Sequence, residues 1–437
     1  MQSDYVSTLP VLFTTQTPHV LPPQKFMIPA AWKRYQLSQL VNKALSLETP
    51  IPFDFIVKGD ILRTSLEEWC SANGVGTEET LELEYVESLM PPSHLSSIPH
   101  DDWVSSVSCR IDGRFVTGSY DGQVRLFDSS QKLVHSFSAH EAPLTSMKVL
   151  QRGQDDVVIA TASQDTTARL TSLSYSSSPS SKTLASLHLH TNTISSISAS
   201  SSGTHLLTGS WDSLIGIWDT SIPEADQVPT DDRKKRRKVN ENGDAPRRKG
   251  PVGIMKGHTG RITSVEFSDD DKYAFSAGLD SSIRCWDVEN EICIGSVIAS
   301  TKPFLSILVP QHPHTLLASS TDRTVTMYDT RQLRAPSSTA TTYTTSSLSH
   351  PATPSALAAS PKNSYHVASG AYDGVVRIWD LRSTRDSIAV ATFKVPEVGA
   401  NGEPRKGDGK ILALDWAKNG LLAVGGESGL DIWNVPE

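Results

Sequence analysis

The sequence has 437 residues, 38% hydrophobic and 20% charged, with a formal net charge of −8, and this length predicts two domains or one large repeat architecture. The acidic balance excludes a protein that coats nucleic acid with its whole surface, although a local basic patch is compatible with it. The chain has no apolar run of the roughly 20 residues that a membrane-spanning helix needs, and no basic start followed by an apolar stretch, so we expect neither membrane insertion nor secretion.

Residues 1–92 are predicted to form a small α+β domain of the ubiquitin-like β-grasp type. Ser65 and Glu68 form a capping box for a short helix that stops near Gly74. The apolar pattern predicts the other elements in chain order: strands at 11–13 and 26–28, a helix with Leu37, Leu40, Val41, Ala44 and Leu45 on one face, and strands at 53–57, 61–62 and 81–86.

From residue 93 to residue 437 a short pattern recurs seven times, at the spacing expected for four-stranded blades. In each copy an acidic residue lies six positions before an aromatic residue or its replacement. The pairs are Asp121 with Phe127, Asp165 with Thr171, Asp212 with Trp218, Asp280 with Trp286, Asp322 with Tyr328, Asp373 with Trp379 and Glu427 with Trp433. The fold class is therefore predicted as mainly β, with a seven-bladed propeller over residues 93–437.

Two further columns of residues align with the acid. A hydroxyl stands four residues before it, at Thr117, Thr161, Thr208, Ser276 and Ser369. A histidine stands 21 to 25 residues before it, at His100, His140, His190, His258 and His350. Repeats five and seven have Ala318 and Ala423 in the hydroxyl column and no aligned histidine, so we expect mainly apolar packing to hold those two blades.

The repeats resemble those of the WD-repeat family, with Gly257-His258 and Trp286-Asp287 as the fullest copy. This resemblance implies a buried hydrogen-bonded chain in each repeat. Its members would be His140, Thr161, Asp165, His190, Thr208, Asp212, Trp218, His258, Ser276, Asp280, Trp286, His350, Ser369, Asp373 and Trp379. A catalytic triad would not recur five times in one chain, whereas a structural tether would. We therefore expect no catalytic residues, no cofactor and no metal of the protein's own.

The chain ends directly after the third strand of the seventh blade. The outer strand of that blade must then come from before the first repeat, and the segment at about 89–100 is the only candidate close enough. We predict that this segment closes the ring.

Residues 221–250 separate the third and fourth repeats and are predicted to be a disordered loop, because they are rich in Pro, Asp, Asn and charge. Two basic clusters lie within this segment: Arg233, Lys234, Lys235, Arg236, Arg237 and Lys238, and then Arg247, Arg248 and Lys249. Clusters at this spacing indicate a bipartite nuclear localisation signal or an arm that contacts RNA phosphates, and the sequence does not separate the two.

The N-terminal domain and the repeats, taken together, resemble a single family. The resemblance rests on five short segments of the sequence: Pro52–Phe55, Leu62–Leu66, Leu83–Tyr85, Pro91–Pro92 and Asp102–Ser106. They are similar to the N-terminal domain shared by the Notchless protein and the WD-repeat ribosome-biogenesis proteins of the Pescadillo complex, and the second group resembles the chain over nearly its full length. The resemblance implies a nuclear protein of nucleolus and nucleoplasm. Its implied partners are the Pescadillo protein, the block-of-proliferation WD-repeat protein, the midasin AAA ATPase and precursors of the large ribosomal subunit.

The same resemblance implies that midasin grips the N-terminal domain through a Mg²⁺ ion that accepts one carboxylate from a loop of its partner. That loop here is Gly74–Thr80, and alignment selects Glu78 as the ligand, with Glu79 as the alternative. The function expected from sequence is a non-enzymatic adaptor in maturation of precursor rRNA and of the large subunit. A WD-repeat substrate receptor or signalling scaffold unrelated to ribosomes is the alternative.

Overall fold

The computed structural model describes residues 7–47, 49–76, 78–151, 156–175, 179–228, 246–298, 302–334, 344–383, 388–396 and 409–436. Contacts divide the chain into two compact units. The first contains residues 1–91, 379–391 and 435–437, and the second contains residues 92–378 and 392–434. The division into domains at 1–92 and 93–437 stays a prediction.

The first unit contains a five-stranded sheet in the order β2-β1-β5-β3-β4. Strands β1 and β5 run parallel, and the other neighbours are antiparallel. In chain order the elements are β1 (Thr8–Thr14), β2 (Lys25–Pro29), α1 (Arg34–Leu45), β3 (Phe53–Val57), β4 (Asp60–Ile61), α2 (Leu66–Asn73) and β5 (Leu81–Glu87). This order confirms the predicted β-grasp fold.

One apolar core fixes both helices of the first unit on this sheet. Alternate residues of β1 and the apolar face of α1 are fully buried in it, represented by Val11 and Leu37. The predicted capping box starts α2, because Ser65 Oγ accepts from Glu68 N and Glu68 Oε2 accepts from Ser65 N, both at 3.3 Å. Gly74 ends α2 with a left-handed φ of 65°. Within the described ranges, no helix has the length and apolar character to cross a membrane.

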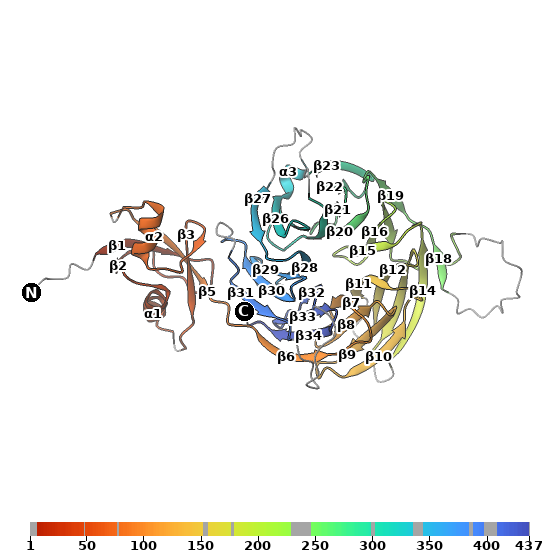
Figure 1. Cartoon of the computed structure of the whole chain (residues 1–437), viewed down its shortest axis with the longest axis horizontal. Helices are drawn as coiled ribbons and strands as arrows, with labels where there is room; N and C mark the ends of the chain where they lie inside the picture. Colours follow the sequence, from red (N-terminus) through yellow and green to blue (C-terminus); the bar gives the residue numbers. More distant parts are fainter. Residues whose placement is uncertain are drawn as a thin grey trace, which may run out of the picture. The chain divides into compact units, whose positions relative to one another are not determined.

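The second unit contains seven sheets that surround a central axis, and we number them as blades in chain order (Figure 1). The strands of blades one to three are β7 (Val104–Ser108), β8 (Phe115–Ser119), β9 (Gln123–Phe127), β10 (Leu133–Ser138), β11 (Leu144–Gln151), β12 (Asp156–Ser163), β13 (Thr167–Ser174), β14 (Ser180–His188), β15 (Ile194–Ala199), β16 (His205–Ser210), β17 (Leu214–Asp219) and β19 (Gly253–Lys256).

Blades four to seven follow the same plan, with the first strand of each nearest the axis. Their elements are β20 (Ile262–Phe267), β21 (Tyr273–Gly278), β22 (Ser282–Asp287), β23 (Ile292–Ile298), β24 (Phe304–Leu308), β25 (Thr315–Ser320), β26 (Thr324–Asp329), the short helix α3 (Thr330–Leu333), β27 (Thr344–Ser349), β28 (Pro354–Ala359), β29 (His366–Ala371), β30 (Val375–Asp380), β31 (Ala391–Lys394), β32 (Ile411–Trp416), β33 (Leu421–Gly426) and β34 (Gly429–Asn434). The seven-bladed propeller is confirmed.

The outer strand of blade seven is β6 (Ser93–Ile98), which precedes the first repeat in the sequence. It pairs antiparallel with β34, from Ser93 opposite Asn434 to Ile98 opposite Leu430. Ile98 packs on the apolar cluster shared by blades seven and one. The predicted ring closure is therefore confirmed.

In the insertion between blades three and four, residues 221–228 and 246–250 are ordered, which corrects the predicted disorder at both ends of 221–250, while residues 229–245 lie outside the described residues. Its last part forms β18 (Arg247–Lys249), which adds a parallel fifth strand to β14 of blade two. Lys249 is 1% exposed, and its ammonium contacts the Asp219 carboxylate and the Ser221 carbonyl. The ion pair of Lys249 and the pairing of β18 with β14 both involve residues far away in the sequence. The composition of the insertion therefore could not predict them. The first basic cluster, 233–238, lies outside the described residues.

If β6 closes the ring, substitutions of two apolar residues of this strand should change the free energy of unfolding by different amounts. Ile98→Asp should lower the free energy of unfolding by about 2 kcal/mol or more, because it places a carboxylate against an apolar cluster. Leu95→Asp should change it by about 0.5 kcal/mol or less, because Leu95 is half exposed. Urea denaturation of the full chain measures both. Equal losses in the two variants would contradict the closure.

Candidate functional site

The predicted tether is present in the third blade as a continuous hydrogen-bonded chain. Trp218 Nε1 lies 2.9 Å from Thr208 Oγ1, which lies 2.8 Å from His190 Nε2, and His190 Nδ1 lies 3.0 Å from Asp212. Because an ionised carboxylate only accepts, the His190 Nδ1–H donates to Asp212. Nε2 of the neutral imidazole then accepts from the Thr208 hydroxyl, whose oxygen accepts the Trp218 N–H. Both ring nitrogens are therefore occupied.

The second and fourth blades repeat this arrangement. His258 contacts Ser276 at 2.6 Å and Asp280 at 2.8 Å, and Trp286 donates to Ser276 at 2.8 Å. In the second blade His140 contacts Thr161 at 2.9 Å and Asp165 at 2.8 Å. The buried members of the predicted network are His140, Thr161, His190, Thr208, Trp218, His258, Ser276, Trp286, His350, Ser369 and Trp379.

The sixth blade differs from the prediction. His350 contacts Ser369 at 2.7 Å as expected, but its Nδ1 faces the Leu348 carbonyl at 3.1 Å instead of Asp373. Asp373 pairs with Arg377, four residues later, at 2.8 Å. The acid is thus held by the third strand of its own blade. The first blade uses the same solution with His100, Thr117, Asp121 and Arg125.

Blades five and seven, which were expected to be held mainly by apolar packing, pair their acid with a lysine. Lys302 Nζ lies 2.7 Å from Asp322, and Lys410 Nζ lies 3.2 Å from Glu427. Lys302 lies two residues before the inner strand of its blade and Lys410 one residue before, whereas the histidines of the other blades lie four residues before. Every blade therefore anchors its acid to a cation or an imidazole.

The charges of this network follow from its hydrogen bonds. Burial alone would raise the pKa of Asp165, but hydrogen bonds from His140 and Thr167 outweigh it and lower that pKa to about 2. Burial lowers the pKa of His258 and lowers that of His350 to about 4. His258 and His350 are therefore neutral, and Asp165 is ionised, near neutral pH. These groups act as structural donors and acceptors, since their polar atoms are already bonded.

A second set of repeated contacts joins neighbouring blades and was missed in the sequence. The second residue of an inner strand places its hydroxyl near the first carbonyl of the next inner strand: Ser105 to Leu144 at 2.6 Å, Thr145 to Ile194 at 2.5 Å, Ser195 to Ile262 at 2.6 Å, Thr263 to Phe304 at 3.0 Å and Ser355 to Ile411 at 2.5 Å. The sequence feature that could have predicted these contacts is a triplet of an apolar residue, a hydroxyl residue and a serine, as at 104–106 and 144–146.

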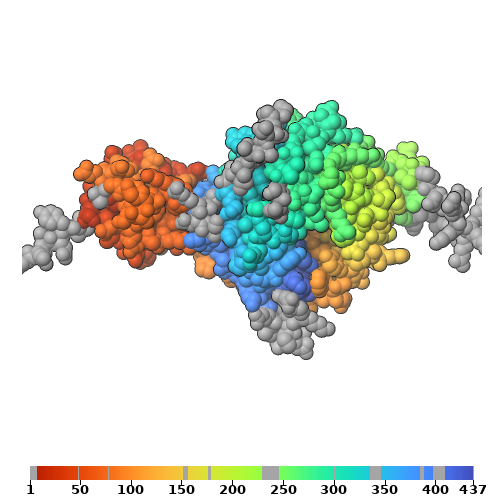
Figure 2. Space-filling view, turned by 45° about the horizontal axis from the view of Figure 1, so that its top comes forward, coloured from red at the N-terminus to blue at the C-terminus, as the bar shows by residue number. Residues whose placement is uncertain are grey.

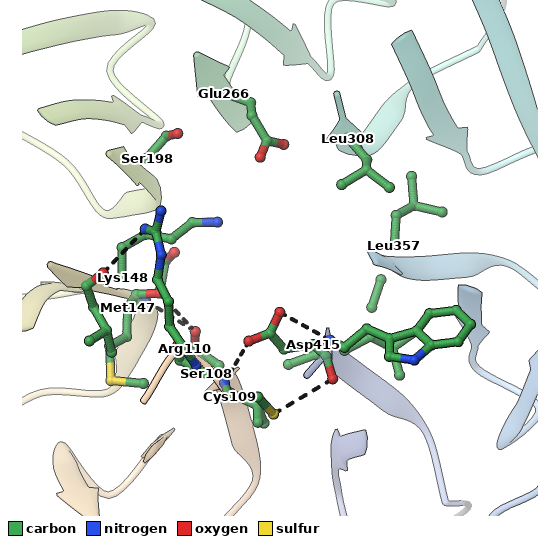
Figure 3. Close-up of a pocket in the computed structure, with 18 of the residues that line it drawn as sticks. Ser108, Cys109, Arg110, Met147, Lys148, Ser198, Glu266, Leu308, Leu357 and Asp415 are labelled. Carbon is green, nitrogen blue, oxygen red and sulfur yellow. Dashed lines mark hydrogen bonds between the residues drawn. The ribbon is translucent and has the colours of Figure 1, made fainter. Parts of the chain in front are cut away.

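A polar cavity of about 690 Å³ lies between the inner strands (Figure 3). Lys148, Glu266 and Asp415 line it, and burial raises the pKa of both carboxyl groups while the Lys148 ammonium opposes the rise. Asp415 accepts from the Cys109 backbone N–H at 2.6 Å, which joins blade seven to blade one. Burial raises the pKa of the Cys109 thiol well above its usual range. The cavity thus contains a buried cross-link and an inert thiol, which do not form a nucleophile and base pair.

The loop that carries Glu78 is anchored at its start and exposed at its tip. Val75 N donates to Cys70 O at 3.0 Å, and the Val75 side chain packs on the core of the first unit. Glu78 and Glu79 are both exposed before β5 begins at Leu81. Both carboxylates are accessible to a metal held by another protein, and the structure does not choose between them. Among the described residues, no group of three or more His, Cys, Asp or Glu could hold a metal ion.

One face of the propeller carries exposed aromatic residues on the turns between second and third strands and on neighbouring loops. Trp211 is 37% exposed and stacks under the Arg261 guanidinium at 4.6 Å. Trp103 and Tyr372 are 40% and 39% exposed, and Trp103 lies 6.0 Å from Tyr120. Exposed tryptophan, tyrosine and arginine are the residues that contribute most to protein interfaces.

Models of three protein families match parts of the chain. The NLE (NUC135) domain matches residues 9–70. The WD domain, G-beta repeat, matches residues 181–219, 249–287 and 342–380. The VPS11-like N-terminal beta-propeller matches residues 96–173.

Curated relatives match almost the whole chain. A protein of Laccaria bicolor named ribosome biogenesis protein YTM1 is 51% identical, over 98% of this chain and 95% of the relative. The protein of the same name from Coprinopsis cinerea is 49% identical over 97% and 94%. That from Coccidioides immitis is 32% identical over 93% and 90%.

The hydroxyl at the centre of the third-blade tether gives a direct test of the network. Thr208→Val should lower the free energy of unfolding by about 2–4 kcal/mol, because it leaves the Trp218 N–H and His190 Nε2 without a partner inside the protein. Thr204→Val, an exposed position of the same blade, should change it by about 0.5 kcal/mol or less. Urea denaturation monitored by tryptophan fluorescence measures both, and equal effects would contradict the tether.

The neutral imidazole of His350 predicts a pH dependence. Its pKa is about 4 in the folded chain and about 6.5 when unfolded, so its contribution to stability is complete above pH 6.5 and is lost as the pH falls toward 4. Between pH 7.5 and pH 5 this loss should be about 2 kcal/mol. His350→Asn should lose less stability than the wild type over the same interval. Unfolding measured at both pH values tests this, and equal losses would contradict it.

Proposed function

Because the chain belongs to the YTM1 family of ribosome biogenesis proteins, we propose that it is a non-enzymatic adaptor in the maturation of large ribosomal subunit precursors and their rRNA. The observation that carries this proposal is the similarity over nearly the full chain to proteins of that name. The structure supports the adaptor part, because the repeated His, Ser/Thr and Asp side chains are engaged in tethers within the blades.

We propose that the aromatic face of the propeller contacts the block-of-proliferation WD-repeat protein, with the Pescadillo protein in the same complex. Trp103, Tyr372 and Trp211 supply rigid, partly exposed area there, which favours a protein partner over a small ligand. Location in the nucleus, in both nucleolus and nucleoplasm, follows from this role. A substrate receptor or signalling scaffold unrelated to ribosomes would not require the NLE domain.

For nuclear import we propose that the run 233–238 acts without the second cluster. An import receptor reads basic side chains of an extended segment, and that requires the residues to be accessible. Lys249 is buried and its ammonium contacts Asp219, while Arg247 and Arg248 belong to β18. This arrangement favours a signal made of one cluster.

The N-terminal unit is proposed to bind midasin through Glu78, which would complete the coordination of a Mg²⁺ ion that belongs to midasin. The support is a carboxylate on a short loop whose base is anchored through Val75, so that little conformational entropy is lost on binding. Glu79 is the alternative ligand, and both are exposed.

Conservative substitutions in this loop test the proposal in the full chain. Glu78→Gln should weaken Mg²⁺-dependent binding to the metal-binding domain of midasin at least tenfold, because it removes the anionic ligand but keeps the shape. Glu79→Gln, the matched control, should leave affinity within about twofold. Biolayer interferometry with Mg²⁺ or with EDTA measures both. Loss of binding in Glu79→Gln alone would assign the other glutamate, and unchanged binding in both variants would overturn a carboxylate ligand.

A further inference from the structure

A groove of about 680 Å³ lies between blades three and four. It is lined by the turns between β15 and β16, between β20 and β21 and between β22 and β23, and by the residues at the start of β19. In an antiparallel blade the first and third turns lie at one end of the strands and the second turn lies at the other end. The groove is therefore on the face opposite to the turns that carry Trp211 and Tyr372. Figure 2 shows the green atoms of blade four beside the yellow-green atoms of blade three.

The groove has an apolar part that is accessible to a partner. Ile217 of β17 and Phe267 of β20 line it and are buried, whereas Val252 lines it and is 61% exposed. Tyr273 and Val288 are half-buried members of the same lining. An exposed aliphatic side chain next to buried apolar ones offers area that an apolar side chain of a partner would cover.

Two carboxylates of blade four bridge to blade three along the groove. Asp271 accepts from the backbone N–H and the hydroxyl of Ser201, at 2.7 and 2.6 Å. Glu291 Oε2 accepts from Ile254 N at 3.1 Å. Gly253 leaves room for this second carboxylate, because a Cβ atom there would lie 2.5 Å from Glu291 Oε1. The two bridges hold the walls of the groove in place before a ligand binds, which lowers the entropy lost on binding.

The lining of the groove is acidic. It contains one lysine, Lys272, and five acids: Asp270, Asp271, Asp287, Glu289 and Glu291. Among the described residues, none of these five acids forms an ion pair with a lysine or an arginine. The Arg334 guanidinium stacks on the Tyr273 ring at 4.1 Å and likewise forms no ion pair with them. The negative charge of the groove is therefore available to a ligand.

The hydrogen bonds of these acids come from neutral donors and leave their charge in place. Burial would raise the pKa of Asp271, but hydrogen bonds from Ser201 and Ser202 outweigh it and lower that pKa. Hydrogen bonds from Asn290 lower the pKa of Asp287. Both carboxylates are therefore ionised near neutral pH.

We propose that this groove binds an extended peptide segment of a partner protein, in which lysine or arginine residues alternate with apolar residues. Every second side chain of an extended segment points to the same side, so cations can approach the acids of the rim while an apolar side chain covers Val252. Complementary charge favours such a segment, and the same charge repels nucleic acid. Within the described ranges no three of the acids are placed to hold one metal ion, which favours a ligand with separate cations.

The proposal gives the propeller a docking surface besides its aromatic face, and it does not rest on the adaptor function. It concerns turns of blades three and four, whereas Trp103 and Tyr372 belong to blades one and six. Loss of peptide binding in the groove and loss of the adaptor contacts are therefore separable outcomes.

The test uses the full chain and a short fluorescein-labelled peptide in which lysine alternates with leucine, with anisotropy at low and at physiological salt. Asp270→Asn with Glu289→Gln removes two charges but keeps the size of both side chains, and it should weaken binding about fivefold or more at low salt. The loss of affinity on raising the salt should be smaller in this variant, since it has fewer charges to screen. Val252→Ser should weaken binding about threefold, because it removes apolar area.

Asp156→Asn with Glu141→Gln is the matched control, because both acids are exposed and belong to blade two. It removes the same charge and should change affinity by less than about twofold. Thermal unfolding checks that all variants are folded. An equal loss in the control pair, or an unchanged affinity in Asp270→Asn with Glu289→Gln, would overturn the groove as the binding site.

Two further measurements identify the occupant. A peptide with serine in place of leucine should bind more weakly, and binding of that peptide and of spermine as tight as that of the original would overturn the assignment to a partly apolar peptide. The original peptide is also measured after the six cations of 233–238 are replaced by glutamine, which should leave its affinity unchanged. Binding that appears only after this replacement would assign the groove to the chain's own basic run instead of a partner.

Discussion

The propeller depends on one constraint, which is that its last blade takes its outer strand from the segment before the first repeat. Strand β6 pairs with β34, and Ile98 packs on the cluster that blades seven and one share. Asp415 adds a second link at the same junction through the Cys109 backbone. A ring of sheets is stable only when every blade has two neighbours, so this junction stabilises all seven blades together.

Within the ring, the acid of each repeat is held in one of three ways. Blades two, three and four use an imidazole, blades one and six use an arginine of the strand that follows the acid, and blades five and seven use a lysine from the loop before the inner strand. Each solution gives the carboxylate a cation or an N–H donor as its partner. The repeats can therefore diverge in sequence while their turns keep one geometry.

The sequence predicted those features that repeat at a fixed spacing or follow a local rule. The acid and hydroxyl columns, the capping box of Ser65 and Glu68, and the closing strand are of this kind. The lysines of blades five and seven, the pairing of Asp373 with Arg377, and strand β18 were not predicted. Each depends on a partner whose distance in three dimensions does not follow from the repeat, and β18 in addition is formed by charged residues that favour exposed loops by composition.

The structure therefore separates groups that hold the fold from groups that remain accessible to partners. The histidines and their acids belong to the first class, while the Glu78 loop and the aromatic face with Trp103 belong to the second. Sedimentation of nuclear extract that contains the tagged full-length chain tests this account most directly. The adaptor role predicts that the wild-type chain migrates with precursors of the large ribosomal subunit. The double variant Trp103→Ala with Tyr372→Ala is expected in light fractions instead. A wild-type chain found only in light fractions, with no large-subunit precursor rRNA, would contradict it.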